Sequence, residues 1–182
     1  MTESFNLQYP IGKCTLPLSL TPDEHATAID TLADLPRHLT TVLDGLSETQ
    51  LDTPYRPGGW TIRQLTHHIA DSHITAYTWM RLALTARSPI EDWPAVFDFD
   101  PEALAALPDS TLPVTVSLQL LDSLHQRWAS TLRAVPDSQW STRGYLHPES
   151  GRCSLEQTLA MYAWHSRHHL AHILNCRAIH DW

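Results

Sequence analysis

Lysine is almost missing from this chain, because Lys13 is the only one among its 182 residues. With 12 basic and 20 acidic residues, the formal net charge is -8, which argues against a general affinity for nucleic acid or for an anionic membrane. No apolar run approaches the roughly 20 residues that a membrane helix needs. The opening MTESFNLQYP lacks the basic and apolar parts of a signal peptide. We therefore expect a cytoplasmic protein without nucleic-acid or membrane partners.

Cysteine is also scarce, and its three positions, Cys14, Cys153 and Cys176, contain no CxxC pair. This pattern excludes a disulfide framework, and Cys153 and Cys176 are interpreted as small packing residues. Hydrophobic residues make up 42% of the chain, as in a globular protein, and 182 residues are enough for one sizeable core but short for two. The sequence predicts a single domain over residues 1–182.

Capping signals and apolar spacing predict four long helices, over residues 21–46, 61–86, 114–134 and 154–177. A bend is expected in the first of them at Pro36. Three of the helix starts carry capping boxes, namely Thr21 with Glu24, Thr61 with Gln64, and Ser154 with Gln157. The connection over residues 87–113 contains five prolines and a possible short helix near 102–107, and a small hairpin is expected around 149–151. We predict an all-α four-helix bundle whose long connection between helices 2 and 3 permits a crossover.

Histidine is the residue in excess, since 12 histidines equal lysine and arginine together. Seven of them fall in two short clusters, which are His67, His68 and His73, and then His165, His168, His169 and His172. At about 100° per residue, His68 lies at the flank of the apolar face of its helix, whereas His67 points toward solvent. On the fourth helix, His165 and His169 face the bundle, and His168 and His172 face its edge.

The spacing of His165 and His169 stacks two imidazoles on one helix face, close enough to share a metal ion. His68, from another helix, would complete a three-histidine site with an open coordination position, which is typical of catalytic centres. The same spacing also arises without metal in a histidine-rich chain. Ser166 follows His165, so the helix lacks the HExxH motif and its glutamate base.

Two long motifs, TPYRPGGWTIRQLTHHIADSH (residues 53–73) and YAWHSRHHLAHI (residues 162–173), resemble those of the DinB superfamily and, within it, of the YfiT-like branch. The resemblance extends over nearly the whole chain. It implies a four-helix bundle that binds one divalent metal ion per subunit, zinc or nickel, through His68, His165 and His169. Similar proteins are usually cytoplasmic and often homodimeric. They have been described as metal-dependent hydrolases, and some resemble thiol S-transferases that use bacillithiol or a comparable low-molecular-weight thiol.

Three functions follow as hypotheses. The leading one is a metal-dependent enzyme that transfers a small-molecule thiol to an electrophilic substrate, because a coordinating thiol is deprotonated outright. The first alternative is a metal-dependent hydrolase that uses water as the nucleophile, although no general base is evident in the motifs. The second alternative is a metal-binding stress protein without catalysis. An open metal position that faces a pocket would favour an enzyme.

Other side chains near the predicted site have weaker signals. Arg56, Trp60 and Tyr162 are candidates for a substrate pocket, and no catalytic side chain is assigned. Arg63, like Arg56, could hold an acidic substrate or be ordinary surface charge, which we favour. Asp71 could orient a ligand, but a surface role is the preferred interpretation.

Overall fold

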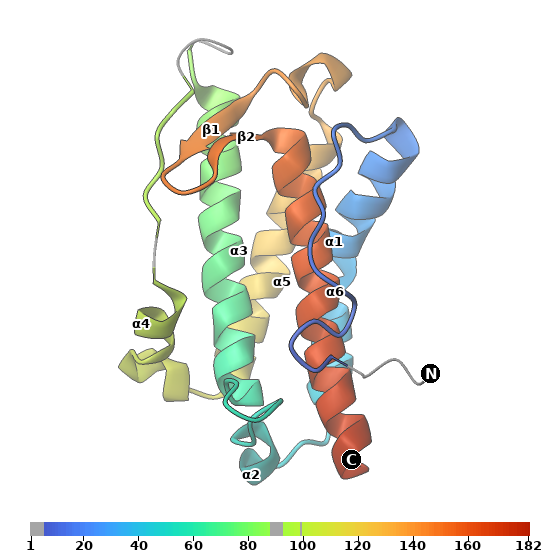
Figure 1. The fold of residues 1–182 in the computed structure, drawn as a ribbon, viewed down its shortest axis with the longest axis vertical. Coiled ribbons are helices and arrows are strands. Elements are labelled where there is room, and N and C mark those ends of the chain that lie inside the picture. Colours follow the sequence, from blue (N-terminus) through green and yellow to red (C-terminus); the bar gives the residue numbers. More distant parts are fainter. Residues whose placement is uncertain (1–5, 88–92, 99) are drawn as a thin grey trace.

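A computed structural model describes residues 6–87, 93–98 and 100–182. Its body consists of four long helices, α1 (Pro22–Leu43), α3 (Ile62–Thr85), α5 (Val114–Arg133) and α6 (Leu155–His180), which stand side by side (Figure 1). The smaller elements are α2 (Glu48–Leu51), α4 (Pro101–Ala105), the 3-10 turns Pro108–Thr111 and Asp137–Gln139, and the strands β1 (Gly144–His147) and β2 (Gly151–Ser154). The predicted four-helix bundle is confirmed.

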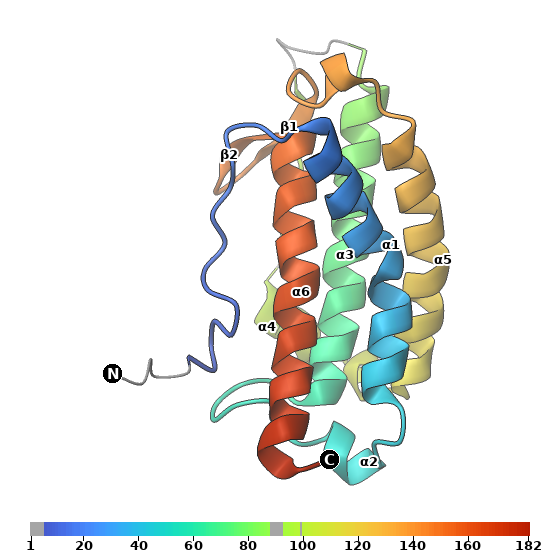
Figure 2. The same cartoon turned by 90° about the vertical axis from the view of Figure 1, so that its right-hand side faces the viewer.

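The order of the helices around the bundle departs from a simple up-and-down arrangement. Both α1 and α3 pack against α5 and α6, so these two consecutive long helices lie diagonally opposite each other. The chain returns along the side of the bundle after α3 and passes through α4, so that α5 runs in the same direction as α3 (Figures 1 and 2). This return is the crossover that the long connection permits.

The predicted helix starts are correct in detail. Thr21, Thr61 and Ser154 are N-caps, and each forms a complete capping box with the residue three positions later, which satisfies free backbone N–H groups in the first turn. The ends are less accurate. The first helix ends at Leu43 instead of 46, because a further capping box, Ser47 with Gln50, begins α2. Pro36 lies inside α1.

The hairpin and the short helix also occur close to their predicted places. β1 and β2 pair antiparallel, with Gly144 opposite Ser154 and His147 opposite Gly151. The short helix α4 covers Pro101–Ala105 instead of 102–107, because Asp100 caps it through the backbone N–H groups of Glu102 and Ala103. Among the helices of residues 6–87, 93–98 and 100–182, none combines the length and the hydropathy of a membrane span.

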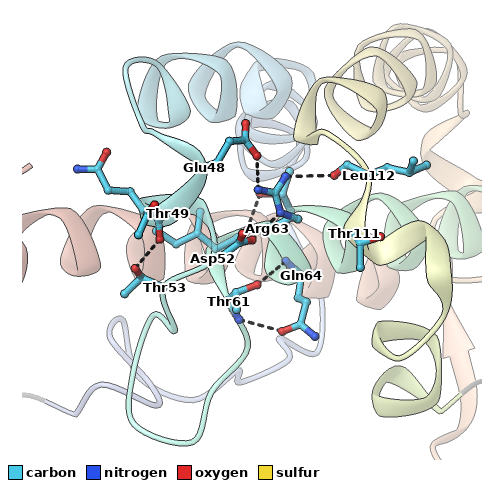
Figure 3. A network of polar contacts seen from close by, with 12 residues as sticks. Glu48, Thr49, Asp52, Thr53, Thr61, Arg63, Gln64, Thr111 and Leu112 are labelled. Atoms are coloured by element: carbon cyan, nitrogen blue, oxygen red, sulfur yellow. Dashed lines mark hydrogen bonds and ion pairs between the residues drawn. The ribbon is translucent and has the colours of Figure 1, made fainter.

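Arg63 ties the start of α3 to its neighbours (Figure 3). Its guanidinium donates to Asp52 Oδ1 at 2.6 Å, to Glu48 Oε2 at 2.5 Å and to the carbonyl oxygen of Leu112 at 3.3 Å. The side chain is 7% exposed, and burial places it under α2 and the end of the long connection. The expectation of ordinary surface charge is therefore wrong, and its partners leave Arg63 no part in holding an acidic substrate.

The apolar core has two parts along the bundle. An upper core, nearer the hairpin, includes Leu32, Met80, Trp128 and Leu159. A lower core includes Leu39, Leu65, Leu121, Ile173 and the buried Cys176, as expected for a packing cysteine. On α3, α5 and α6, histidines stand between the residues of these two cores. The middle of the bundle is therefore a polar layer enclosed by apolar packing above and below.

Candidate metal centre

The three predicted ligands meet in this middle layer. His68 comes from α3, and His165 and His169 lie one turn apart on α6. One nitrogen from each ring lies within 4.8 Å of the other two, and the Nε2 atoms of His165 and His169 are 3.0 Å apart. The ring centroid of His68 is 5.4 Å from that of His165 and 5.1 Å from that of His169. The fold thus brings the triad together from two helices.

Burial controls the charge of these rings. It lowers the pKa of His68 to about 4, and it holds the pKa values of His165 and His169 well below 6.5, with further lowering from the neighbouring imidazoles. An ionised imidazole would have to lose its hydration without gaining an opposite charge. All three rings are therefore neutral at pH 7, the form in which imidazole binds metals.

The donor set fits a transition-metal ion. Three neutral nitrogen donors suit Zn, Ni, Cu or Fe, whereas Mg and Ca prefer oxygen. Among the described residues, the candidate metal-binding group that includes His68 consists of histidines alone, without a carboxylate or a cysteine. Three protein ligands leave a position for another molecule.

An open pocket of about 480 Å³ borders the triad. Its lining residues are Gln8, Tyr9, Tyr55, Arg56, Gly58, Gly59, Trp60, Glu102, His68, His168, His169 and His172. His68 and His169 thus reach the pocket, and His165 lies deeper. An ion held by the triad would be accessible to a small molecule from this side.

Two of the three predicted pocket residues line this cavity. The ring of Trp60 is tilted against that of His68, with centroids 4.5 Å apart, and Arg56 lies nearby. Tyr162 does not line the pocket, and that prediction is wrong. Its ring packs against His73 and His165 on the core side, and its hydroxyl lies 3.4 Å from Ser72 Oγ, because its helix position points to the upper core.

Two predictions about the remaining histidines need correction. His67 is buried, with its ring nitrogens 2.7 Å from Ser117 Oγ and 3.0 Å from the Leu112 carbonyl oxygen, because the start of α5 covers this face of α3. His168 and His172 do lie on the outer side of α6, but both are buried. The N-terminal segment covers them (Figure 2), with Tyr9 near His168 and the Gln8 carbonyl oxygen near His172.

Several neighbours of the triad were not predicted. Glu102, in the long connection, lines the pocket, and its Oε2 accepts a hydrogen bond of 3.0 Å from Trp60 Nε1. His73 and His172 contact the α6 ligands directly. In the described part of the chain, no hydrogen bond joins the Asp71 carboxylate to a histidine, so these imidazoles take the orienting place considered for it. Only the excess of histidine in the sequence pointed to them.

Comparison with known proteins agrees with this architecture. The profile of the DinB superfamily matches residues 31–173. The chain belongs to the DinB superfamily. Similar superfamily members include proteins from Bacillus cereus strain B4264 and Bacillus thuringiensis subsp. konkukian, which are 43% and 42% identical over 97% of this chain and 99% of theirs. Both bear the name "putative metal-dependent hydrolase".

A solved structure of a DinB-like relative is also similar. YfiT from Bacillus subtilis, described as "a probable metal-dependent hydrolase with an unusual four-helix bundle topology", has a TM-score of 0.90 and 39% sequence identity. The match covers 97% of this chain and 99% of YfiT. The diagonal placement of α1 and α3 is therefore shared with a superfamily member of known structure.

Proposed function

We propose that the protein is a divalent-metal-dependent hydrolase that acts on a small anionic substrate. The observation that supports this most strongly is the convergence of three neutral imidazoles at the wall of an open pocket. The names of the Bacillus relatives support the reaction class. A divalent ion held by His68, His165 and His169 would supply a nucleophile at neutral pH, because it would lower the pKa of a bound water or thiol.

Glu102 is the residue best placed to accept a proton during hydrolysis. It is the carboxylate among the residues that line the pocket. Trp60 holds it there, since the indole Nε1 donates to Glu102 Oε2 while the indole ring packs on His68. One tryptophan thus connects the candidate base to a candidate metal ligand and fixes their relative positions.

Arg56 supports the assignment of an anionic substrate. Its guanidinium lies in the pocket wall, held by the Tyr55 hydroxyl at 3.3 Å and the Pro57 carbonyl oxygen at 3.2 Å. No ion pair of Arg56 occurs in the described part of the chain, in contrast to Arg63. A carboxylate or phosphate group on a substrate would provide the missing bidentate partner.

Thiol transfer is the second candidate. The neutral donor set favours it, because three imidazoles leave both positive charges of a divalent ion to be balanced by an anionic ligand such as a thiolate. The pocket lining contains no cysteine or serine, so the nucleophile has to come from a second molecule. The thiol would be bacillithiol or a similar low-molecular-weight thiol, and the acceptor an electrophile.

One experiment separates the two reactions. Untagged, zinc-loaded or nickel-loaded protein is tested on ester, amide and phosphoester substrates, and separately with thiols and monochlorobimane. We expect hydrolysis without thiol, and we expect Glu102→Gln to lower its rate about 100-fold or more. Glu149→Gln, in the turn between β1 and β2, is the matched control and should leave the rate unchanged.

Two results would overturn this ranking. Turnover that requires a thiol and is insensitive to Glu102→Gln identifies a transferase. Turnover that is the same with and without metal removes the metal-dependent function altogether.

A further inference from the structure

Five buried or partly buried imidazole rings form a continuous row through the middle of the bundle. The row begins at the carbonyl oxygen of Leu32 in α1 and ends at the carbonyl oxygen of Gln8 in the N-terminal segment. In order, its rings are His125, His73, His165, His169 and His172. The successive distances between nitrogen or oxygen atoms are 2.5, 3.0, 3.0, 3.0, 3.4 and 3.3 Å. We call this set the histidine row.

The two ends of the histidine row determine where protons must lie. A carbonyl oxygen only accepts hydrogen bonds, so Nδ1–H of His125 donates to Leu32 and Nε2–H of His172 donates to Gln8. A neutral imidazole carries one N–H and one lone pair. The other nitrogen of each terminal ring is therefore an acceptor that faces the inside of the row.

Counting the protons shows that the row is incomplete. It contains six contacts but only five N–H groups when all five rings are neutral, so one contact between two nitrogens has no proton. Two facing lone pairs in a protein interior are costly. The contacts of His73 with His125 and His165 lie beyond the reach of the pocket lining. Facing lone pairs cost least where the pocket can relieve them, and His169 lines the pocket. The proton-free contact is therefore one of the two contacts that His169 makes.

The proton order of the inner rings follows from this placement. His73 donates from Nδ1 to His125 Nε2, and His165 donates from Nδ1 to His73 Nε2. The lone pair of His165 Nε2 then faces His169 Nε2 at 3.0 Å. His68 approaches the same place from α3. A cation between these nitrogens satisfies the proton-free contact, and His169 then donates from Nδ1 to His172 Nδ1.

We propose that His73, His125 and His172 are positioning residues that hold the proton of both α6 ligands on Nδ1 and so present two Nε2 lone pairs to one divalent cation. His73 acts directly on His165, His125 acts through His73, and His172 acts on His169. The inference rests on the metal centre of the proposed function but not on its reaction class. His68 has no such partner among the described residues, and only ring packing orients it.

The direct test is long-range ¹H–¹⁵N NMR of histidine-labelled protein at pH 7.5, which reports which ring nitrogen carries the proton. In the metal-free protein we expect Nδ1–H at His125, His73 and His165. Addition of zinc should also fix Nδ1–H at His169. An Nε2–H form of His73 or His165 in the metal-free wild-type protein would overturn the proposal.

Variants at His73 extend the test to affinity. In His73→Leu, the Nδ1 proton of His165 loses its acceptor, so His165 should change to the Nε2–H form and the zinc Kd should rise about 10-fold to 100-fold. His73→Gln keeps one donor and one acceptor and should recover most of the affinity. His67→Leu, which replaces another buried histidine that lies outside the row, is the control for packing and should leave the His165 signal and the Kd unchanged.

The alternative is a second ion at His168, His169 and His172, whose ligand atoms also lie within 4.8 Å of one another. One zinc per chain is expected, and two would assign His169 Nδ1 to a metal and overturn the proposed order. Unchanged zinc binding and an unchanged His165 signal in His73→Leu would do the same. Absence of hydrolysis, by contrast, removes the proposed reaction and leaves these NMR and affinity results as they are.

Discussion

Two polar networks that each include a buried side chain of α3, Arg63 in one and His73 in the other, differ in how their hydrogen bonds are completed. Around Arg63, a buried guanidinium meets Glu48, Asp52 and the Leu112 carbonyl oxygen (Figure 3), so its charge and donors are matched within the chain. We call this set the Arg63 cluster. The histidine row carries no charge and lacks one proton. The first network is complete within the chain, whereas the second, in our proposal, is completed by a cation from outside.

The sequence alone does not distinguish Arg63 from Arg56, since either could hold an acidic substrate or be ordinary surface charge. Both arginines lie within the motif of residues 53–73 that carries His68. The burial of Arg63 under α2 shows that a charged side chain beside a site is structural when its partners belong to the same chain. Arg56, four positions before the Trp60 that packs on His68, lacks such partners among the described residues and lies in the pocket wall.

The largest effect is expected from removing a ligand. His68→Ala, His165→Ala or His169→Ala should weaken metal binding by more than about 100-fold, beyond the loss typical of an outer residue. His67→Ala and His168→Ala should largely retain the metal. Equilibrium dialysis of untagged protein with elemental analysis measures this. Equal loss in His168→Ala would place the ion in the group of His168, His169 and His172.

Acid should have the next largest effect, through the buried histidines in and beside the histidine row. Burial lowers the pKa values of His68, His125, His168 and His172 to about 4, so between pH 6.5 and 4 the unfolded chain binds more protons than the folded chain. The free energy of unfolding therefore falls with falling pH in that window, by up to about 1.4 kcal/mol per pH unit for each ring, and it levels off only about one pH unit above 6.5, where the unfolded rings are also neutral.

Urea unfolding of metal-free protein from pH 8 to pH 4 measures this dependence. Each buried imidazole that is replaced should reduce the slope, so His125→Gln should unfold with a weaker pH dependence than the wild-type protein. A free energy of unfolding that is constant between pH 6.5 and 4.5 would contradict neutral, buried rings.

The Arg63 cluster should show a smaller and asymmetric effect. The double variant Glu48→Ala with Asp52→Ala leaves a buried guanidinium without its carboxylates and should cost about 3 kcal/mol of stability. Arg63→Met leaves two carboxylates that are already 79% and 58% exposed, and should cost only about 1 kcal/mol. Denaturant unfolding measures both, and zinc affinity should not change in either. A change in zinc affinity would mean that the two networks are coupled.

Local signals in the sequence predicted much of the fold. Capping boxes at Thr21, Thr61 and Ser154 are short-range patterns that require no knowledge of the partner helix, and they located three of the long helices. The i, i+4 pair His165 and His169, together with the wheel position of His68, was sufficient to bring the triad together. These predictions depend on helix geometry alone, which is why they agree with the structure.

What sequence reasoning missed depends on contacts between distant segments. His67 and His172 were assigned to solvent or to an edge, but the start of α5 and the N-terminal segment cover them. Glu102 reaches the pocket from the long connection, whose path no local pattern fixes. Tyr162, a candidate for the pocket, packs on the core side against His73 and His165 instead. The expected homodimer stays a prediction from family resemblance.

Metal titration of the untagged, metal-free protein tests the central claim most directly. Calorimetry with zinc or nickel, combined with elemental analysis after dialysis, should give one tightly bound ion per chain in the wild-type protein and none in His165→Ala. Tight binding that persists in His165→Ala, or no binding in the wild-type protein, would contradict a centre built from His68, His165 and His169.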